Sequence, residues 1–116
     1  KRLEKWNVQG IRRLAKLQTQ LLIAALRCVK VGGLVVYSTC TFAPEENECV
    51  LEHVLSKKSI DAKVVPIPQA LVPASTRPVL KEWQGTQFSQ HLEGAIRMIP
   101  DETTTGFFVA VLERKS

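Results

Sequence analysis

The chain has 116 residues, of which 45% are hydrophobic and 6% aromatic, a composition that allows one small domain with a single core. No stretch approaches the roughly 18 consecutive apolar residues of a membrane span, and three irregularly spaced cysteines do not make a disulfide framework. These features exclude a membrane-spanning helix and a disulfide-stabilised secreted domain, so we expect a soluble, intracellular protein with no membrane partner. The net charge of +5 favours a polyanionic partner and is equally compatible with an ordinary basic surface.

A long amphipathic helix is the first predicted element. Its apolar residues recur at the spacing of one helix face, and Gly32-Gly33 supplies a stop. The chain starts at Lys1, without an initiator Met and within this helical pattern, so we expect it to be a piece of a longer protein. The residues predicted to be buried on the apolar face are Ile11, Leu14, Ala15, Leu21, Leu22, Ala25 and Val29.

A cysteine follows the next predicted element. The run Leu34 to Tyr37 lacks polar alternation, which is typical of a strand covered on both faces, and a helix followed by such a strand indicates a parallel α/β sheet. Ligands bind beyond the carboxyl ends of the strands in such sheets. Cys40 is therefore placed for chemistry, but its position alone does not name a reaction, and a free thiol is more often structural.

A proline and three carboxylates mark the start of a second predicted helix. Pro44 fits a first helical turn, where its missing N–H costs nothing, and Glu45, Glu46 and Glu48 place negative charge at the favourable end of the helix dipole. We assign these carboxylates a structural role first. The predicted buried stripe of this helix is Val50, Leu51, Val54 and Leu55.

A Pro-rich stretch interrupts the second half of the chain. A short strand is predicted at Ala62 to Pro66, whereas Ile67 to Gln90 is weakly periodic, with Trp83 and Phe88 as single large apolar residues. A structureless connection of this length is uncommon in a compact domain. We interpret it as a substrate-facing loop or as a segment that packs on something outside the chain.

The chain closes on a second apolar strand. It is predicted at Phe107 to Leu112, after Ala95 to Ile99 and a polar turn. Two strands that look covered on both faces need more helices and strands than this chain holds, because bare apolar faces and strand edges favour aggregation. We therefore expect another half, upstream or on a partner chain, to complete the fold.

Three segments carry motifs that can be matched to a known family. They are Val35-Val36-Tyr37-Ser38-Thr39-Cys40-Thr41, the following Pro44-Glu45-Glu46-Asn47-Glu48, and the terminal Gly106-Phe107-Phe108-Val109-Ala110-Val111-Leu112. Together they resemble the late motifs of the Nol/Nop/Sun family of RNA 5-methylcytosine methyltransferases. The predicted first helix, up to Val29-Lys30-Val31-Gly32-Gly33, resembles the stretch before the family's Cys, and Pro68 to Glu93 lies outside the resemblance.

The resemblance implies an α/β fold, the C-terminal half of a class I S-adenosylmethionine-dependent methyltransferase, with a Rossmann-like sheet and an antiparallel final strand. Residues 1–116 would be the C-terminal portion of a single catalytic domain whose cofactor-binding half lies upstream. The implied activity is methylation of cytosine C5 in rRNA or tRNA, in the cytoplasm or the nucleolus. Cys40 is the implied nucleophile and adds covalently to C6, with Thr39 and Thr41 shaping its loop.

RNA is the partner that the resemblance implies. Arg97, before the final hairpin, is a candidate RNA contact, and Arg12, Arg13 and Lys16 are weaker ones because an exposed charged helix face is usually only solvated. The family's Asp-x-Pro-Cys segment and glycine-rich loop do not occur in this chain. We therefore expect the chain alone to be inactive, with S-adenosylmethionine bound mainly by the upstream half, at residues that this sequence does not identify.

Other functions stay open beside this one. The main alternative is a non-catalytic RNA-binding or scaffolding fragment of the same fold. A cysteine hydrolase would pair Cys40 with His53 or His91 as its base, whereas a phosphatase is disfavoured because no Arg follows Cys40 in a phosphate-binding loop. Cys49 and His53 have the spacing of two metal ligands, but zinc needs four and no paired-Cys spacing occurs, so we predict no metal site.

Overall fold

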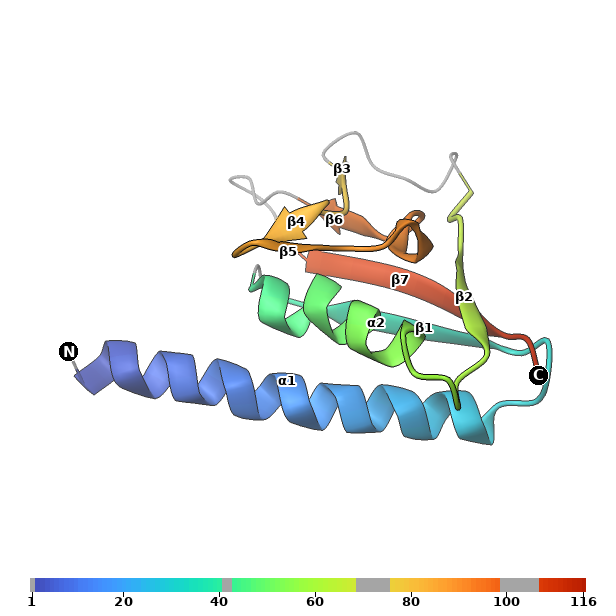
Figure 1. Ribbon diagram of the computed structural model, residues 1–116, viewed down its shortest axis with the longest axis horizontal. Coiled ribbons are helices and arrows are strands. Elements are labelled where there is room, and N and C mark those ends of the chain that lie inside the picture. Colours follow the sequence, from blue (N-terminus) through green and yellow to red (C-terminus); the bar gives the residue numbers. More distant parts are fainter. Residues whose placement is uncertain (1, 41–42, 69–75, 99–106) are drawn as a thin grey trace.

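Two helices cover one face of a twisted antiparallel sheet in this computed structural model, which describes residues 2–40, 43–68, 76–98 and 107–116 (Figure 1). For residues 2–9 only the course of the helix is described. The helical elements are α1 (Arg2–Cys28), η1 (Pro44–Glu46), α2 (Glu48–Leu55) and η3 (Gln90–Leu92). The strands are β1 (Leu34–Thr39), β2 (Ala62–Val65), β3 (Thr76–Pro78), β4 (Glu82–Trp83), β5 (Thr86–Gln87), β6 (Ile96–Met98) and β7 (Phe107–Arg114).

The last strand organises the main sheet. β7 pairs with β1 along one edge and with both β2 and β6 along the other, and β3 extends the sheet beyond β6. Each of these pairings is antiparallel, which confirms the expected antiparallel final strand. The expected parallel sheet is not found within the described residues, because the strand next to β1 is the antiparallel β7. Phe108 of β7 lies opposite Thr39 of β1, and Glu113 lies opposite Leu34.

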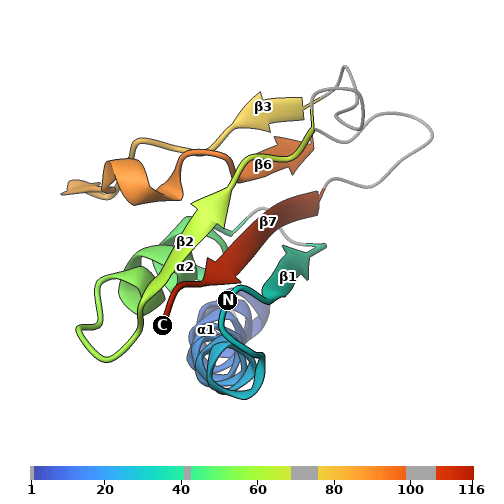
Figure 2. The same ribbon diagram turned by 90° about the vertical axis from the view of Figure 1, so that its right-hand side faces the viewer.

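The core lies between the helices and one face of the sheet. Figure 2, which looks along α1, shows both helices on the same side. Alternate residues of β7 point into this core, as the period of a strand requires. Its buried side chains are Leu22 and Leu26 of α1, Val50, Leu51 and Val54 of α2, Tyr37 of β1, and Phe108, Ala110 and Leu112 of β7, with Leu92 and Ala95 beside them.

The other face of β1 is open in this chain. Leu34 and Val36 are 58% and 64% exposed, whereas Tyr37 and Thr39 are buried, so the strand alternates instead of being covered on both faces as predicted. The prediction that Leu14 and Leu21 of α1 are buried is also wrong. They are exposed because α2 and the sheet cover only the side of α1 that carries Leu22 and Leu26, not theirs. No helix in the described ranges has the length and apolarity to span a bilayer.

Part of the Pro-rich stretch packs back on this chain. β4 and β5 form a hairpin whose two turn residues, Gln84 and Gly85, have φ of 50° and 82°, the sign that a tight two-residue hairpin turn requires. Val79 and Phe88, which flank the hairpin, pack against the core. The described part of the stretch therefore belongs to this fold, whereas residues 69–75 lie outside the described ranges.

Removing a core side chain of α2 should destabilise the fold strongly. Leu51 has no exposed surface, so Leu51→Ala leaves a cavity and should lower the free energy of unfolding by roughly 2–5 kcal/mol, measured by urea denaturation of the full-length protein. Lys58→Ala, on the exposed turn after α2, is the control and should change it by less than about 0.5 kcal/mol. Equal effects of the two substitutions would contradict this position of the core.

Candidate active site

Cys40 directly follows the carboxyl end of β1 and is exposed. Side chains of a strand alternate between its faces, so Cys40 continues the open side that carries Val36 and Ser38. Its thiol is therefore not sealed in the core between the helices and the sheet. Thr39 is buried on the opposite side, and Thr41 lies outside the described residues.

Two hydrogen bonds fix the inward-facing residues of β1. The Tyr37 hydroxyl donates to the backbone carbonyl of Glu46 at 2.5 Å, and the Thr39 hydroxyl donates to Oδ1 of Asn47 at 2.5 Å. Burial and the nearby Glu46 carboxylate raise the pKa of Tyr37, which keeps this donor protonated. Because a slip of one residue would turn every side chain to the other face, these bonds hold Cys40 outward.

The segment that supplies these acceptors is itself buried. Glu46 is 5% exposed, and Asn47 and Glu48 are fully buried. The Glu46 carboxylate accepts a hydrogen bond from the Gln18 side chain of α1 at 3.3 Å, and the Asn47 carbonyl accepts the backbone N–H of Leu51, which starts α2. A structural role is thus confirmed for Glu46, as predicted.

Glu48 forms a buried ion pair with Arg97 of β6. Both carboxylate oxygens bind the guanidinium, with Nε to Oε2 at 2.6 Å, and Oε2 also accepts the backbone N–H of Leu80 at 2.9 Å. The Arg97 side chain is 13% exposed, and its guanidinium lies 5.9 Å from the centre of the Phe108 ring. Arg97 therefore has a structural role, and its contact with RNA stays a prediction.

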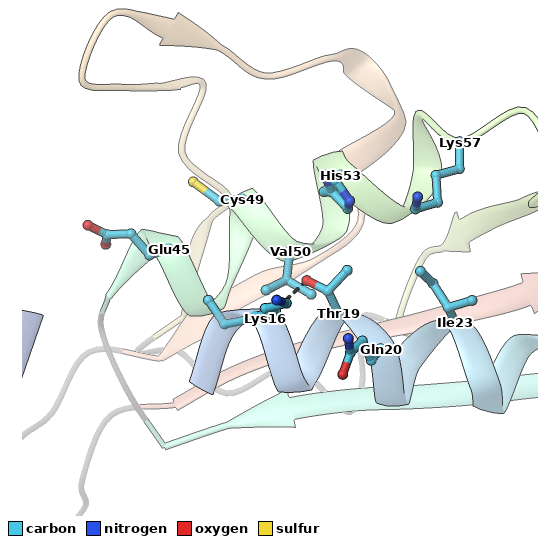
Figure 3. Close-up of a pocket in the computed structure, with 10 residues that line it drawn as sticks. Lys16, Thr19, Gln20, Ile23, Glu45, Cys49, Val50, His53 and Lys57 are labelled. Carbon is cyan, nitrogen blue, oxygen red and sulfur yellow. Dashed lines mark hydrogen bonds between the residues drawn. The ribbon is translucent and has the colours of Figure 1, made fainter. Parts of the chain in front are cut away.

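The other predicted RNA contacts lie on the surface of α1. Arg12, Arg13 and Lys16 are all exposed, and they are separated from Arg97, which lies inside against Phe108. Lys16 also lines a groove between α1 and α2 (Figure 3). The structure thus does not gather the four predicted cations into one patch, and their contact with RNA stays a prediction.

The residues proposed for a cysteine hydrolase or a metal site are not brought together. His53 and His91 are exposed on α2 and η3, and within the described ranges no hydrogen bond joins Cys40 to either ring, as a cysteine hydrolase would need. No group of three or more His, Cys, Asp or Glu residues that could hold a metal ion occurs among the described residues. Cys28 is exposed on the last turn of α1.

Sequence reasoning missed the anchoring roles of Tyr37 and Asn47. In the sequence Tyr37 belongs to an apolar run, and Asn47 is only part of a motif. The available signal was the alternation of Tyr37 and Thr39, two side chains with hydroxyl groups on one face of a strand, since buried hydroxyls need partners. The partner could not be named without the fold.

Replacing Glu48 should be more costly than replacing Glu45, which is only half-buried. Glu48→Gln leaves the Arg97 guanidinium without a counter-charge in a mostly buried site and should lower the free energy of unfolding by roughly 3 kcal/mol or more. Glu45→Gln, the control, should cost less than about 1 kcal/mol. The double variant Glu48→Met/Arg97→Met should recover part of the loss in urea denaturation, and no recovery would contradict a paired charge.

Cys49 should react only at high pH. Burial, followed by the carboxylates of Glu45, Glu48 and Glu52, raises the pKa of this thiol, because all of them disfavour the thiolate. In a Cys28→Ser/Cys40→Ser protein, where Cys49 is the one cysteine left in residues 1–116, iodoacetamide alkylation is followed on the peptide that contains Cys49. The midpoint of its rate against pH should lie above about 8.5, the value of a free thiol. Glu52→Gln should lower that midpoint, and a midpoint below the free-thiol value would refute the assignment.

Comparison with known proteins gives relatives of one kind. A family model described as 16S rRNA methyltransferase RsmB/F matches residues 3–113. The chain is 34% identical over 110 residues to a tRNA (cytosine(49)-C(5))-methyltransferase of Pyrococcus abyssi (strain GE5 / Orsay), a match that covers 94% of this chain and 34% of that protein. It is 48% identical over 58 residues to the 5-cytosine rRNA methyltransferase nsun-4 of Caenorhabditis elegans, covering 50% of this chain and 12% of the relative.

A solved structure has the same fold. A methyltransferase homolog protein from Pyrococcus horikoshii superposes with a TM-score of 0.79 at 35% sequence identity, covering 93% of this chain and 33% of that one. The chain therefore spans about a third of the length of this structure and of the Pyrococcus abyssi relative.

Proposed function

Because the chain belongs to the RsmB/F family of 16S rRNA methyltransferases, we propose that the protein containing it methylates cytosine at C5 in RNA, with Cys40 as the nucleophile. The relatives are named for tRNA and for rRNA cytosines, so the proposal covers both classes of target. The observation that supports it most is the position of Cys40, exposed beyond the carboxyl end of β1 and held outward by two buried hydrogen bonds.

The chemistry needs a thiolate at this position. C5 of cytosine is too weak a nucleophile to take a methyl group unaided. Addition of the Cys40 sulfur to C6 forms an S–C6 bond and moves the electron pair of the C5–C6 double bond toward C5, which can then accept the methyl group. Once C5 has lost its proton to a base, the electron pair of that C–H bond restores the double bond and the sulfur leaves C6 as thiolate.

The methyl donor would be held elsewhere in the protein. S-adenosylmethionine supplies the methyl group in this class of reaction, but the residues of this chain do not fit it by themselves. The chain lacks a glycine-rich loop of the phosphate-binding type. We therefore propose a role for Cys40 and assign no cofactor-binding residue here.

The open face of β1 also indicates that another part of the protein completes the catalytic domain. Leu34 and Val36 are exposed on the same side of β1 toward which Cys40, just beyond the strand, points, and the outer edge of β1 has no partner strand in the described part of the chain. Since the chain spans about a third of its relatives, we propose that residues 1–116 are the C-terminal part of one catalytic domain whose remainder covers this face. The isolated chain should then be inactive.

The proposal is tested by trapping the covalent intermediate. RNA that carries 5-fluorocytidine cannot lose a proton from C5, so the full-length protein, incubated with this RNA and S-adenosylmethionine, should form an adduct that survives denaturing electrophoresis. Cys40→Ala should abolish the adduct, and the exposed cysteine variant Cys28→Ser should retain it. An adduct that persists in Cys40→Ala would move the nucleophile elsewhere, and RNA binding without any adduct would favour the non-catalytic alternative.

A further inference from the structure

The outer surfaces of α1 and α2 enclose a groove, which we call the α1–α2 groove (Figure 3). The two helices run in the same direction along it, and its volume is about 470 Å³. From Lys16 to Ile23 the α1 wall contains eight residues and rises by about 10 Å along the helix axis. The groove is lined by Ala15, Lys16, Thr19, Gln20, Ile23, Glu45, Cys49, Val50, His53 and Lys57.

Basic side chains stand along the length of this groove. Lys16 lies at one end, Lys57 at the other, and the His53 ring lies between them (Figure 3). Arg12, one helical turn before Lys16 and exposed, extends the same row beyond the groove. Glu45 is the single carboxylate among the lining residues. The excess of positive charge makes the groove complementary to an anionic partner.

The floor of the groove narrows the choice of partner. It is apolar, formed by Ala15, Ile23 and Val50, and none of the lining residues is Phe, Tyr or Trp, so the imidazole of His53 is the one aromatic ring among them. Successive bases therefore have no row of rings to stack on, and a nucleic acid would be held mainly through its phosphates, with its sugars over the apolar floor. Binding of this kind depends on charge and salt and carries little sequence preference.

One end of the groove lies close in the chain to the proposed nucleophile. Glu45, which lines the groove and belongs to η1, is five residues after Cys40, a separation of at most about 18 Å even for a fully extended chain. An RNA strand whose reacting cytosine meets Cys40 on the open side of β1 therefore has only a short distance to cross, around the end of the sheet, to enter the groove. We propose that the α1–α2 groove binds the sugar–phosphate backbone of the substrate RNA beside the reacting nucleotide, with Lys16 and Lys57 contacting phosphates. This inference rests on the function proposed above.

The salt dependence of RNA binding tests this inference. Each phosphate contact to a single strand contributes about 0.7 to the slope of log association constant against log salt concentration. In fluorescence anisotropy with labelled oligocytidylate over a KCl series, Lys16→Gln/Lys57→Gln in the full-length protein should therefore reduce the slope by about 1.4. Lys30→Gln/Lys115→Gln removes the same charge from exposed sites outside the groove and should leave the slope nearly unchanged. Equal slopes for the two double variants would overturn the proposal.

Two further measurements probe the charge and the accessibility of the groove. Glu45→Gln removes the opposing carboxylate and should tighten binding of oligocytidylate, and weaker binding would count against the groove. In a Cys28→Ser/Cys40→Ser protein, oligocytidylate should slow alkylation of Cys49, which lines the groove. A Cys49 that becomes reactive only in urea would show that another part of the protein covers the groove and would overturn the proposal.

The adduct assay separates this inference from the proposed function. At saturating 5-fluorocytidine RNA, Lys16→Gln/Lys57→Gln retains Cys40 and should still form the covalent adduct, with a higher RNA concentration needed for half-maximal yield. An unchanged half-maximal concentration would overturn the groove proposal alone. No adduct in the wild-type protein would overturn the methyltransferase proposal, whatever the binding slopes are.

Discussion

Three consecutive buried polar side chains, from the end of η1 to the first residue of α2, constrain the rest of this structure. Glu46, Asn47 and Glu48 would each be costly to bury without partners, and each has a partner on a different element. Glu46 binds α1 through Gln18, Asn47 binds β1 through Thr39, and Glu48 binds β6 through Arg97. This short segment thereby connects α1, β1 and β6. Because its hydrogen bond to Thr39 fixes which side of β1 faces the core, it also sets the side to which Cys40 points.

The eight residues of α2 have different tasks on different sides. Val50, Leu51 and Val54 fill the core. Glu48 and Glu52 lie toward the Pro-rich stretch, where the Glu52 carboxylate accepts the backbone N–H and the hydroxyl of Ser89. The remaining side, with Cys49 and His53, faces the α1–α2 groove. Such a short helix is stable only within this environment, since isolated helices of this length do not form in water.

Much of this fold could be predicted from the sequence. Helical periodicity, the Gly32-Gly33 stop, the apolar strands and the thiol beyond a strand end are local signals, and the structure has α1, β1, α2 and β7 at those places. The exposure of Leu14 and Leu21 was not predictable, because periodicity shows which residues share a face and not whether a neighbour covers it. The Glu48–Arg97 pair escaped prediction because its members lie 49 residues apart.

The position of β7 affects how the chain can reach this fold. It is the last strand, yet it pairs with β1, β2 and β6, and Phe108 meets Thr39 across most of the sequence. Pairing between such distant segments requires closure of long loops, which slows folding. Synthesis from the amino end leaves the edge of β1 that pairs with β7 without its partner until nearly all of residues 1–116 have been made, so this edge is exposed to wrong pairing for that time.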